Sequence, residues 1–263
     1  MKRIITLSGD IGGGKSAVSK SLEKTLGYKI IGTGAIQREI AQRRGMTTLE
    51  LNELSITDTR VDDEIDSFVI NLGKTAEDII IDSRLAWHFI PQAFKTFLTV
   101  APLIGAQRVF GDSRQEEKNP TLEKTLENNL HRQKLEKERF KHLYNVDLRH
   151  FENYDAVIDT SYSPPDAISA KLTELYAMAL KGGSFPRLWV NAKRLTPTKA
   201  VADCSSAEIE ALRIAINQNG FDYTQPIEIS YHEDKFSIAD GHKRVFAAQL
   251  ENLDLIPCLL THN

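Results

Sequence analysis

The sequence has few cysteines and no long hydrophobic run. Cys204 and Cys258 are the only two cysteines among 263 residues, and their separation matches no metal-ligand spacing. We therefore expect two free thiols rather than a disulfide or a zinc site. The apolar run near the N-terminus has the length of a strand, too short for a signal-peptide core or a membrane span. These absences favour a cytoplasmic protein without a membrane partner.

The sequence also lacks a strong charge of one sign. Its 33 Lys and Arg against 36 Asp and Glu give a formal net charge of -3, so no global positive charge attracts nucleic acid. A local basic patch stays compatible with this balance. The hydrophobic content of 41% suffices for a buried core, and the length fits one large domain or two smaller ones.

Short apolar runs alternate with helical patterns through the first 180 residues. Runs that are apolar on both faces and separated by helices predict a parallel sheet covered on both sides. The predicted strands are 4–7, 28–31, 79–81, 96–100 and 156–158. The predicted helices are 15–26, 36–44, 62–73, 103–110, 122–143 and 165–180.

The pattern changes at "KGGSFPRLW", whose two glycines and proline predict a linker over residues 182–187. This linker separates a first domain, residues 1–181, from a small α+β domain, residues 188–263. In the second domain we predict strands at 188–190, 227–231, 236–238 and 255–260, and helices at 206–218 and 241–250.

Glycines cluster directly after the first predicted strand, in "GDIGGGKS". This stretch fits the pattern G-x-x-x-x-G-K-[ST], with a strand before it and a helix after it. Glycine lets backbone N–H groups point at phosphate oxygens, while the lysine reaches the β- and γ-phosphates and the serine hydroxyl binds Mg²⁺. We therefore predict binding of a nucleoside triphosphate, ATP. The predicted contacts are Gly9, Asp10, Gly12, Gly13, Gly14, Lys15, Ser16 and Ala17.

The first domain resembles the cytidylate kinase family over about residues 2–180. The resemblance rests on "YKIIGTGAIQREIAQRRGMTTLELNEL", "IIIDSRLAWHF", "FLTVAPLIGAQRVFGDSR" and "HRQKLEKERFKHLYNVDLRHFENYDAVIDTS". It implies an α/β P-loop nucleoside monophosphate kinase fold with a five-stranded parallel sheet. It also implies an ATP-dependent nucleotide kinase whose acceptor is a (deoxy)pyrimidine nucleoside monophosphate, CMP or dCMP. Ser83 departs from the family, which usually has glycine before the arginine.

The same resemblance implies roles for individual residues. Phosphoryl transfer needs positive charge around a transition state whose negative charge is distributed over the equatorial phosphate oxygens. Guanidinium groups suit this task because they bind phosphate bidentately. The implied catalytic residues are Lys15, Arg84, Arg114 and Arg132, the second pair belonging to a lid. The implied acceptor-binding residues are Thr33, Gly34, Arg38, Asp82, Arg84 and Arg108, and Ser16 and Asp82 are the implied Mg²⁺ ligands. A surface salt bridge is the alternative for any single arginine.

The second domain resembles the ParB/sulfiredoxin superfamily in "QPIEISYHEDKFSIADGHKRVFAAQLENLDLIPCLL". The resemblance implies a phosphate-binding site at a helix N-terminus, formed by Asp240, Gly241, His242, Lys243 and Arg244. The alternative is a surface helix with Asp240 as its N-cap. "DGHKR" lacks the sulfiredoxin cysteine, and Lys199 stands where free-serine kinases have glutamate. We therefore favour a nucleotide- or nucleic-acid-sensing role over independent catalysis.

Three functions stay open at this point. The first is a CMP or dCMP kinase with an attached ParB-like domain, in which deletion from Gly182 onward leaves CMP phosphorylation measurable. The second is a P-loop kinase of a larger acceptor, such as a modified base in DNA that the second domain presents. The third is a nucleotide-gated DNA-binding switch, which Lys15, Ser16 and the arginine set disfavour.

Overall fold

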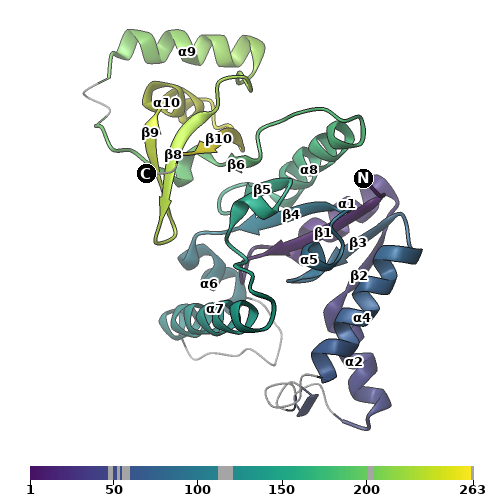
Figure 1. Cartoon of the computed structure of the whole chain (residues 1–263). Coiled ribbons are helices and arrows are strands. Elements are labelled where there is room, and N and C mark those ends of the chain that lie inside the picture. The colour runs from purple at the N-terminus through teal and green to yellow at the C-terminus, as the bar shows by residue number, and fades with distance from the viewer. Residues whose placement is uncertain (47–49, 52–53, 55–59, 112–120, 201–203, 262–263) are drawn as a thin grey trace.

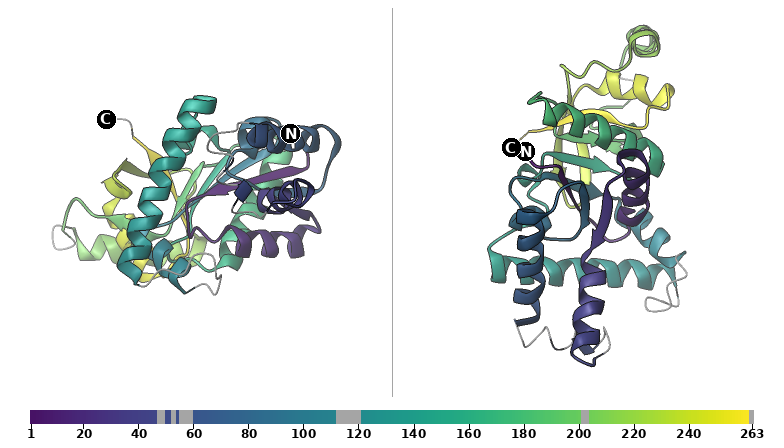
Figure 2. Two further views of the ribbon diagram at one scale, coloured as in Figure 1. Left: turned by 90° about the horizontal axis from the view of Figure 1, so that it is seen from below. Right: turned by 90° about the vertical axis from the view of Figure 1, so that its right-hand side faces the viewer.

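The computed structural model describes residues 1–46, 50–51, 54, 60–111, 121–200 and 204–261. In these residues ten strands form one continuous sheet, in the order β2-β3-β1-β4-β5-β6-β10-β8-β9-β7. Figures 1 and 2 show helices on both faces of the N-terminal part of this sheet. The helices and strands that the sequence predicts are all present, with ends displaced by a few residues.

The N-terminal part of the sheet contains the five predicted strands, all in parallel pairs. They are β1 (Ile4–Gly9), β2 (Lys29–Gly32), β3 (Ile79–Asp82), β4 (Phe94–Thr99) and β5 (Ala156–Asp159). Every residue of β1 is buried, as expected for a central parallel strand covered on both sides. Parallel pairing brings the carboxyl ends of these strands to one edge, where the glycine-rich loop follows β1.

Alternation along β1 divides the core into two layers. Ile5 and Leu7 pack in a cluster with Val18 and Leu22 of α1 (Lys15–Leu26) and with residues of α8 (Pro165–Leu180). Ile4 joins a different cluster, formed with residues of α2 (Thr33–Arg43) and α4 (Arg60–Thr75). Successive side chains of a strand point to opposite faces, so the continuous apolar run of β1 contributes to both layers.

The sheet does not end after five strands. Strand β6 (Leu188–Val190) pairs in parallel with β5, and β10 (Ile256–Leu260) pairs antiparallel with β6. Trp189 is 1% exposed and lies in the same cluster as Ile5 and Leu7. The predicted five-stranded sheet is therefore corrected to part of a ten-stranded one, because an apolar strand directly after the glycines pairs with β5.

The C-terminal residues form the rest of the sheet with two helices. The strands are β7 (Leu195–Thr196), β8 (Ile227–His232) and β9 (Lys235–Asp240), and the helices are α9 (Ser206–Asn219) and α10 (His242–Leu250). β8 and β9 form an antiparallel hairpin, whose tip in Figure 1 extends toward α6 (Pro102–Phe110) and α7 (Leu122–Tyr144). Sequence reasoning missed β7 and the short helix α5 (Ala86–Phe89), which are too short to show a period.

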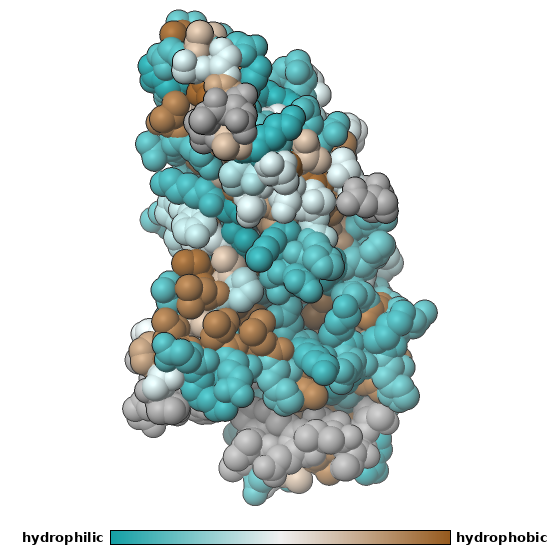
Figure 3. Space-filling view, turned by 90° about the vertical axis from the view of Figure 1, so that its left-hand side faces the viewer, coloured by the Kyte–Doolittle hydropathy of each residue, from teal (hydrophilic) through white to brown (hydrophobic). Residues whose placement is uncertain are grey.

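Helix α7 is long and mostly solvent-exposed. Thr121 caps its first turn by accepting a hydrogen bond from the Lys124 N–H, and Asn145 ends it in a left-handed conformation. Thr125 is its single fully buried residue. On the face in Figure 3, hydrophilic side chains predominate, and hydrophobic side chains gather in one area below the middle.

Two further features bear on the sequence expectations. Cys204 and Cys258 are both free thiols, as predicted. Among the described residues no helix has the length and apolar character that crossing a lipid bilayer requires.

Candidate functional site

The glycine-rich loop runs from Gly9 to Gly14, between β1 and α1, as the motif predicts. Gly12 has φ +75°, and a Cβ there would lie 2.3 Å from the carbonyl oxygen of Gly105 in α6. Gly14 has φ +79° and occupies the N-cap position of α1. Any larger residue would be strained at both positions, so glycine lets the loop wrap closely around the N-terminus of the helix.

Asp10 fixes this loop to the end of β4. Its Oδ2 accepts hydrogen bonds from the Thr99 hydroxyl at 3.0 Å and from the Val100 N–H at 3.1 Å. The Asp10 N–H donates to the Leu98 carbonyl oxygen at 2.9 Å. The predicted contact of Asp10 with the nucleotide stays a prediction, and in the structure its side chain holds the loop in place.

Lys15 lies where several charged segments meet. Its side chain is half-buried, and loss of hydration together with the nearby Arg84 guanidinium lowers its pKa to about 8. The carboxylates of Asp82, Glu136 and Asp10 oppose this shift. The P-loop, the end of β3 and α7 therefore all contribute charge around one ammonium group.

Arg84 and Arg132 share one carboxylate, that of Glu136. The Arg84 Nε lies 3.3 Å from Glu136 Oε2, and the Arg132 Nε lies 3.1 Å from Glu136 Oε1. Arg84 also donates to the Gly9 carbonyl oxygen. The structure thus brings together Lys15, Arg84 and Arg132, which the sequence had only placed on separate segments. Sequence reasoning missed Glu136, although its i,i+4 spacing from Arg132 was a usable signal.

The predicted acceptor residues lie at the neighbouring strand ends. Gly32 pairs with Asp82 across β2 and β3, and the Thr33 hydroxyl donates to the Asp82 carbonyl oxygen at 3.4 Å. Arg38 is exposed on α2, and its Nη1 lies 3.7 Å from the position that a Cβ on Gly34 would take. Thr33, Gly34, Arg38 and Asp82 therefore lie together, beside the segment that carries Arg84.

Arg108 and Arg114 differ from the other arginines. The Arg108 Nη1 donates to the Gly12 carbonyl oxygen at 3.2 Å and to the Thr160 hydroxyl at 3.1 Å. Its described contacts place it against the P-loop and the segment after β5, on the donor side of the site. Burial lowers its pKa from the ordinary arginine value. Arg114 lies outside the described residues.

The residues near Lys15 fit a bound Mg²⁺. The described residues contain no cluster of three or more His, Cys, Asp or Glu side chains suited to a metal. Mg²⁺ in phosphoryl-transfer sites needs no such cluster, because one or two protein oxygens and the substrate phosphates hold it. The exposed Ser16 hydroxyl at the start of α1 and the half-buried Asp82 carboxylate supply oxygens of this kind.

The arrangement matches a known family in sequence as well as in geometry. Residues 4–162, more than half of the chain, match the cytidylate kinase-like family. The chain belongs to the cytidylate kinase-like family. The match contains the P-loop, the strand ends with Thr33 and Asp82, and α7 with Arg132 and Glu136. The expectation of an ATP-dependent nucleotide kinase is thereby confirmed at the level of the family.

Curated relatives and solved structures agree with this membership. A cytidylate kinase from Natronomonas pharaonis is 31% identical over 64% of this chain and 85% of its own length. A cytidylate kinase from Sulfurisphaera tokodaii is 33% identical over 66% of this chain and 94% of its own length. The shikimate kinase of Bacteroides thetaiotaomicron covers 67% of this chain and 99% of its own, with TM-score 0.51 and 15% identity, which supports the fold.

The C-terminal part lies outside the region that matches the cytidylate kinase-like family. Helix α10 has Gly241 at its N-cap position, with φ 97° and no side-chain cap. The alternative prediction of Asp240 as N-cap is therefore wrong, because the left-handed turn before the helix requires glycine. His242 is 5% exposed, and its Nε2 lies 2.9 Å from the Thr198 hydroxyl.

The basic side chains of this helix start have protein partners. The Lys243 Nζ lies 2.7 Å from Glu208 Oε2, and Arg244 donates to the Gln225 carbonyl oxygen. A phosphate site at Asp240 to Arg244 stays a prediction.

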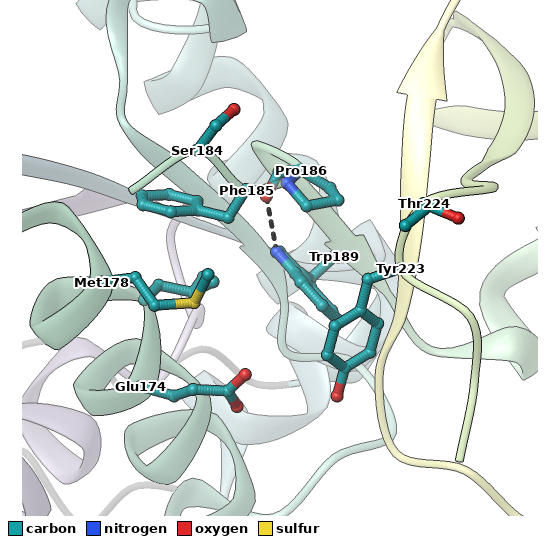
Figure 4. A pocket seen from close by; sticks show the side chains of 9 residues that line it. Glu174, Met178, Ser184, Phe185, Pro186, Trp189, Tyr223 and Thr224 are labelled. Carbon is teal, nitrogen blue, oxygen red and sulfur yellow. Dashed lines mark hydrogen bonds between the residues drawn. The ribbon is translucent and has the colours of Figure 1, made fainter. Parts of the chain in front are cut away.

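A separate cavity lies between α8 and the segment before β8. It measures about 370 Å³, and Met178, Phe185, Trp189 and Tyr223 give it a mostly apolar lining (Figure 4). The dashed line in Figure 4 is the hydrogen bond from the Trp189 indole N–H to the Pro186 carbonyl oxygen. Its lining includes no P-loop residue, so this cavity is distinct from the kinase site.

Proposed function

We propose that this protein transfers the γ-phosphoryl group of ATP to CMP or dCMP. The observation that carries the proposal is the meeting of Lys15, Arg84 and Asp82 at the P-loop, beside the Thr33–Arg38 segment. This juxtaposition places a triphosphate-binding loop next to a second group of polar side chains able to hold an acceptor. The cytidylate kinases among the relatives support a cytidine nucleotide as that acceptor.

In the proposed mechanism the P-loop binds the donor. Backbone N–H groups between Gly9 and Ser16 face the phosphate oxygens, and the N-terminus of α1 adds a favourable dipole. Lys15 binds the β- and γ-phosphates as a charged amine, which its pKa of about 8 permits at neutral pH. Ser16 and Asp82 would hold a Mg²⁺ ion, which would supply positive charge beside the phosphate oxygens.

Arg84 and Arg132 act on the transferring group. Glu136 holds both guanidinium groups by ion pairs at 3.3 and 3.1 Å, so they are oriented before substrates arrive. Positive charge fixed in advance stabilises a transition state without reorganisation at the moment of reaction. Thr33, Gly34 and Arg38 bind the acceptor, and Arg108 supports the donor loop rather than the acceptor.

We also propose a second phosphate site, binding of nucleic acid and a cytoplasmic location. No side chain caps the N-terminus of α10, which supports a second phosphate site at Asp240 to Arg244. Binding of nucleic acid through the C-terminal part belongs to the same proposal, as does a cytoplasmic location.

The test is ADP release from ATP and Mg²⁺ against a panel of ribo- and deoxyribonucleoside monophosphates. We expect selective turnover of CMP or dCMP, and a loss of roughly 100-fold or more in kcat/KM for Arg84→Met. Arg43→Met is the matched control, because Arg43 is exposed and ion-paired with Glu64 away from the loop. Absence of ADP release with every monophosphate, or equal losses of kcat/KM in Arg84→Met and Arg43→Met, would contradict the proposal.

A further inference from the structure

One contact joins the C-terminal part of the chain to the P-loop. Arg149 follows α7, and its Nη2 and Nε lie 2.8 and 3.1 Å from Asp10 Oδ1. Its Nη1 donates to the Tyr231 hydroxyl at 2.7 Å and forms an ion pair with Asp234. Tyr231 and Asp234 belong to β8 and to the turn of the β8–β9 hairpin. One guanidinium group therefore bridges the hairpin tip and the loop aspartate.

This bridge is shielded from solvent. The side chains of Arg149, Asp10 and Asp234 are 18%, 9% and 24% exposed to solvent. A charged group with so little exposure depends on its partners, since an unpaired charge there loses most of its hydration without compensation. Because Arg149 is the shared partner of two carboxylates, it couples the Asp10 side chain to the hairpin tip.

The turn itself indicates that Asp234 has a specific role. His232 pairs with Lys235, so Glu233 and Asp234 form a two-residue turn with φ of 45° and 64°. Gly, Asn and Asp are the residue types that most readily adopt the left-handed region of such turns, so Asp234 suits its position. Asp234 accepts a hydrogen bond from the Tyr231 hydroxyl at 2.9 Å, and its carbonyl oxygen accepts one from Arg194. These contacts hold Asp234 at the hairpin tip, where its carboxylate forms the ion pair with Arg149.

We propose that Tyr231, Asp234 and Arg149 are positioning residues for the ATP site. The hairpin tip orients Arg149, Arg149 orients Asp10, and Asp10 fixes the P-loop to Thr99 and Val100 at the end of β4. The C-terminal part of the chain thereby completes the donor site without touching ATP. This inference rests on the proposed function only in requiring that the P-loop binds ATP.

Two consequences distinguish this role from a merely structural tie. A positioning role changes ATP affinity while leaving the KM for CMP unchanged, because Thr33, Gly34 and Arg38 lie on other segments. Loss of a contact that only stabilises the fold lowers thermal stability and changes the ATP affinity and the KM for CMP together. The positioning role also operates through Arg149, so the effect of a hairpin variant must disappear when Arg149 is already absent.

The experiment measures the Kd of MgATP by equilibrium titration of the full chain, without any acceptor. For Asp234→Asn we expect Kd to rise roughly fivefold, the size of coupling typical of contacting residues. The matched control is Glu233→Gln, the adjacent turn residue, whose side chain is 81% exposed. We expect the control to stay within about twofold of the parent protein. The same two substitutions are then repeated in an Arg149→Met background, where we expect no further change.

Each outcome decides the question. An unchanged Kd in Asp234→Asn, or an equal rise in the Arg149→Met background, would overturn the proposal. If Asp234→Asn does not fold, Tyr231→Phe removes one contact to Arg149 and is expected to raise Kd about twofold to threefold, again only with Arg149 present. Because ATP binding is measured without acceptor, absence of CMP turnover would contradict the proposed function and leave this test intact.

Discussion

The affinity of the protein for ATP should fall as the pH rises above 8. Loss of hydration and the Arg84 guanidinium lower the pKa of Lys15 from the ordinary lysine value of 10.5 to about 8. A bound triphosphate places negative charge beside the amine and raises that pKa again. The complex therefore keeps a proton that the free protein loses at alkaline pH.

The size and sign of the effect follow from proton linkage. Below pH 8 Lys15 is protonated both in the free protein and in the ATP complex, so the affinity for ATP is at its maximum and does not depend on this proton. Above pH 8 the free protein must take up a proton to bind ATP, and affinity falls by up to tenfold for each pH unit. Between pH 7 and pH 9 we expect Kd to rise about tenfold.

The assay is an equilibrium titration with MgATP at a series of pH values, with Mg²⁺ in excess. Lys15→Arg is the matched control, because a guanidinium group stays charged over this range and its Kd profile should be flat. Circular dichroism at each pH confirms that the protein stays folded. A flat profile for the parent protein, or a sloping one for the control, would refute this account of Lys15.

Three further changes have defined outcomes. The Glu136 carboxylate raises the pKa of Lys15 and the Arg84 guanidinium lowers it. The alkaline loss of ATP affinity should therefore begin at lower pH in Glu136→Gln and at higher pH in Arg84→Met. Shifts in the same direction in both variants would contradict these two charge effects. Tyr144→Phe removes the hydrogen bond to Asp66 Oδ2 at 2.8 Å and should lower the free energy of unfolding in urea by about 1 kcal/mol, with no change meaning that water replaces the hydroxyl. Trp189→Ala should lower the free energy of unfolding by about 3–5 kcal/mol in the same assay. A decrease below about 1 kcal/mol would show that β6 is dispensable to the core.

Much of the N-terminal fold follows from sequence. Each apolar run of β1 to β5 can be recognised from its own residues, without knowledge of its neighbours in the sheet. The glycine pattern predicts the loop between β1 and α1. The end of the sheet could not be predicted, because the glycines of "KGGSFP" indicate a turn but do not say whether the next strand pairs with β5. That pairing makes β6 part of the core, so deletion from Gly182 onward removes Trp189 from the core cluster and is expected to destabilise the chain.

The candidate site was predicted in part. Lys15, Ser16, Arg84 and Arg132 were identifiable because motif and family resemblance mark them. The position of Arg108 against Gly12 was not, since a helix after β4 can direct an arginine toward either the donor or the acceptor.

Arg149 gave no sequence signal of its own. It lies in a segment that carries the family resemblance, but the resemblance assigns it no role, and its role depends on a hairpin more than 80 residues further along the chain. Contacts of that separation arise from topology, which periodicity and spacing do not reveal.

Phosphoryl transfer from ATP to a cytidine monophosphate can be measured directly. The most direct test is ADP release with ATP, Mg²⁺ and each ribo- and deoxyribonucleoside monophosphate, with duplex DNA and free serine as further acceptors. We expect turnover with CMP or dCMP well above all other acceptors. Turnover confined to DNA or serine, or none with any acceptor by a folded protein that binds ATP, would contradict this expectation.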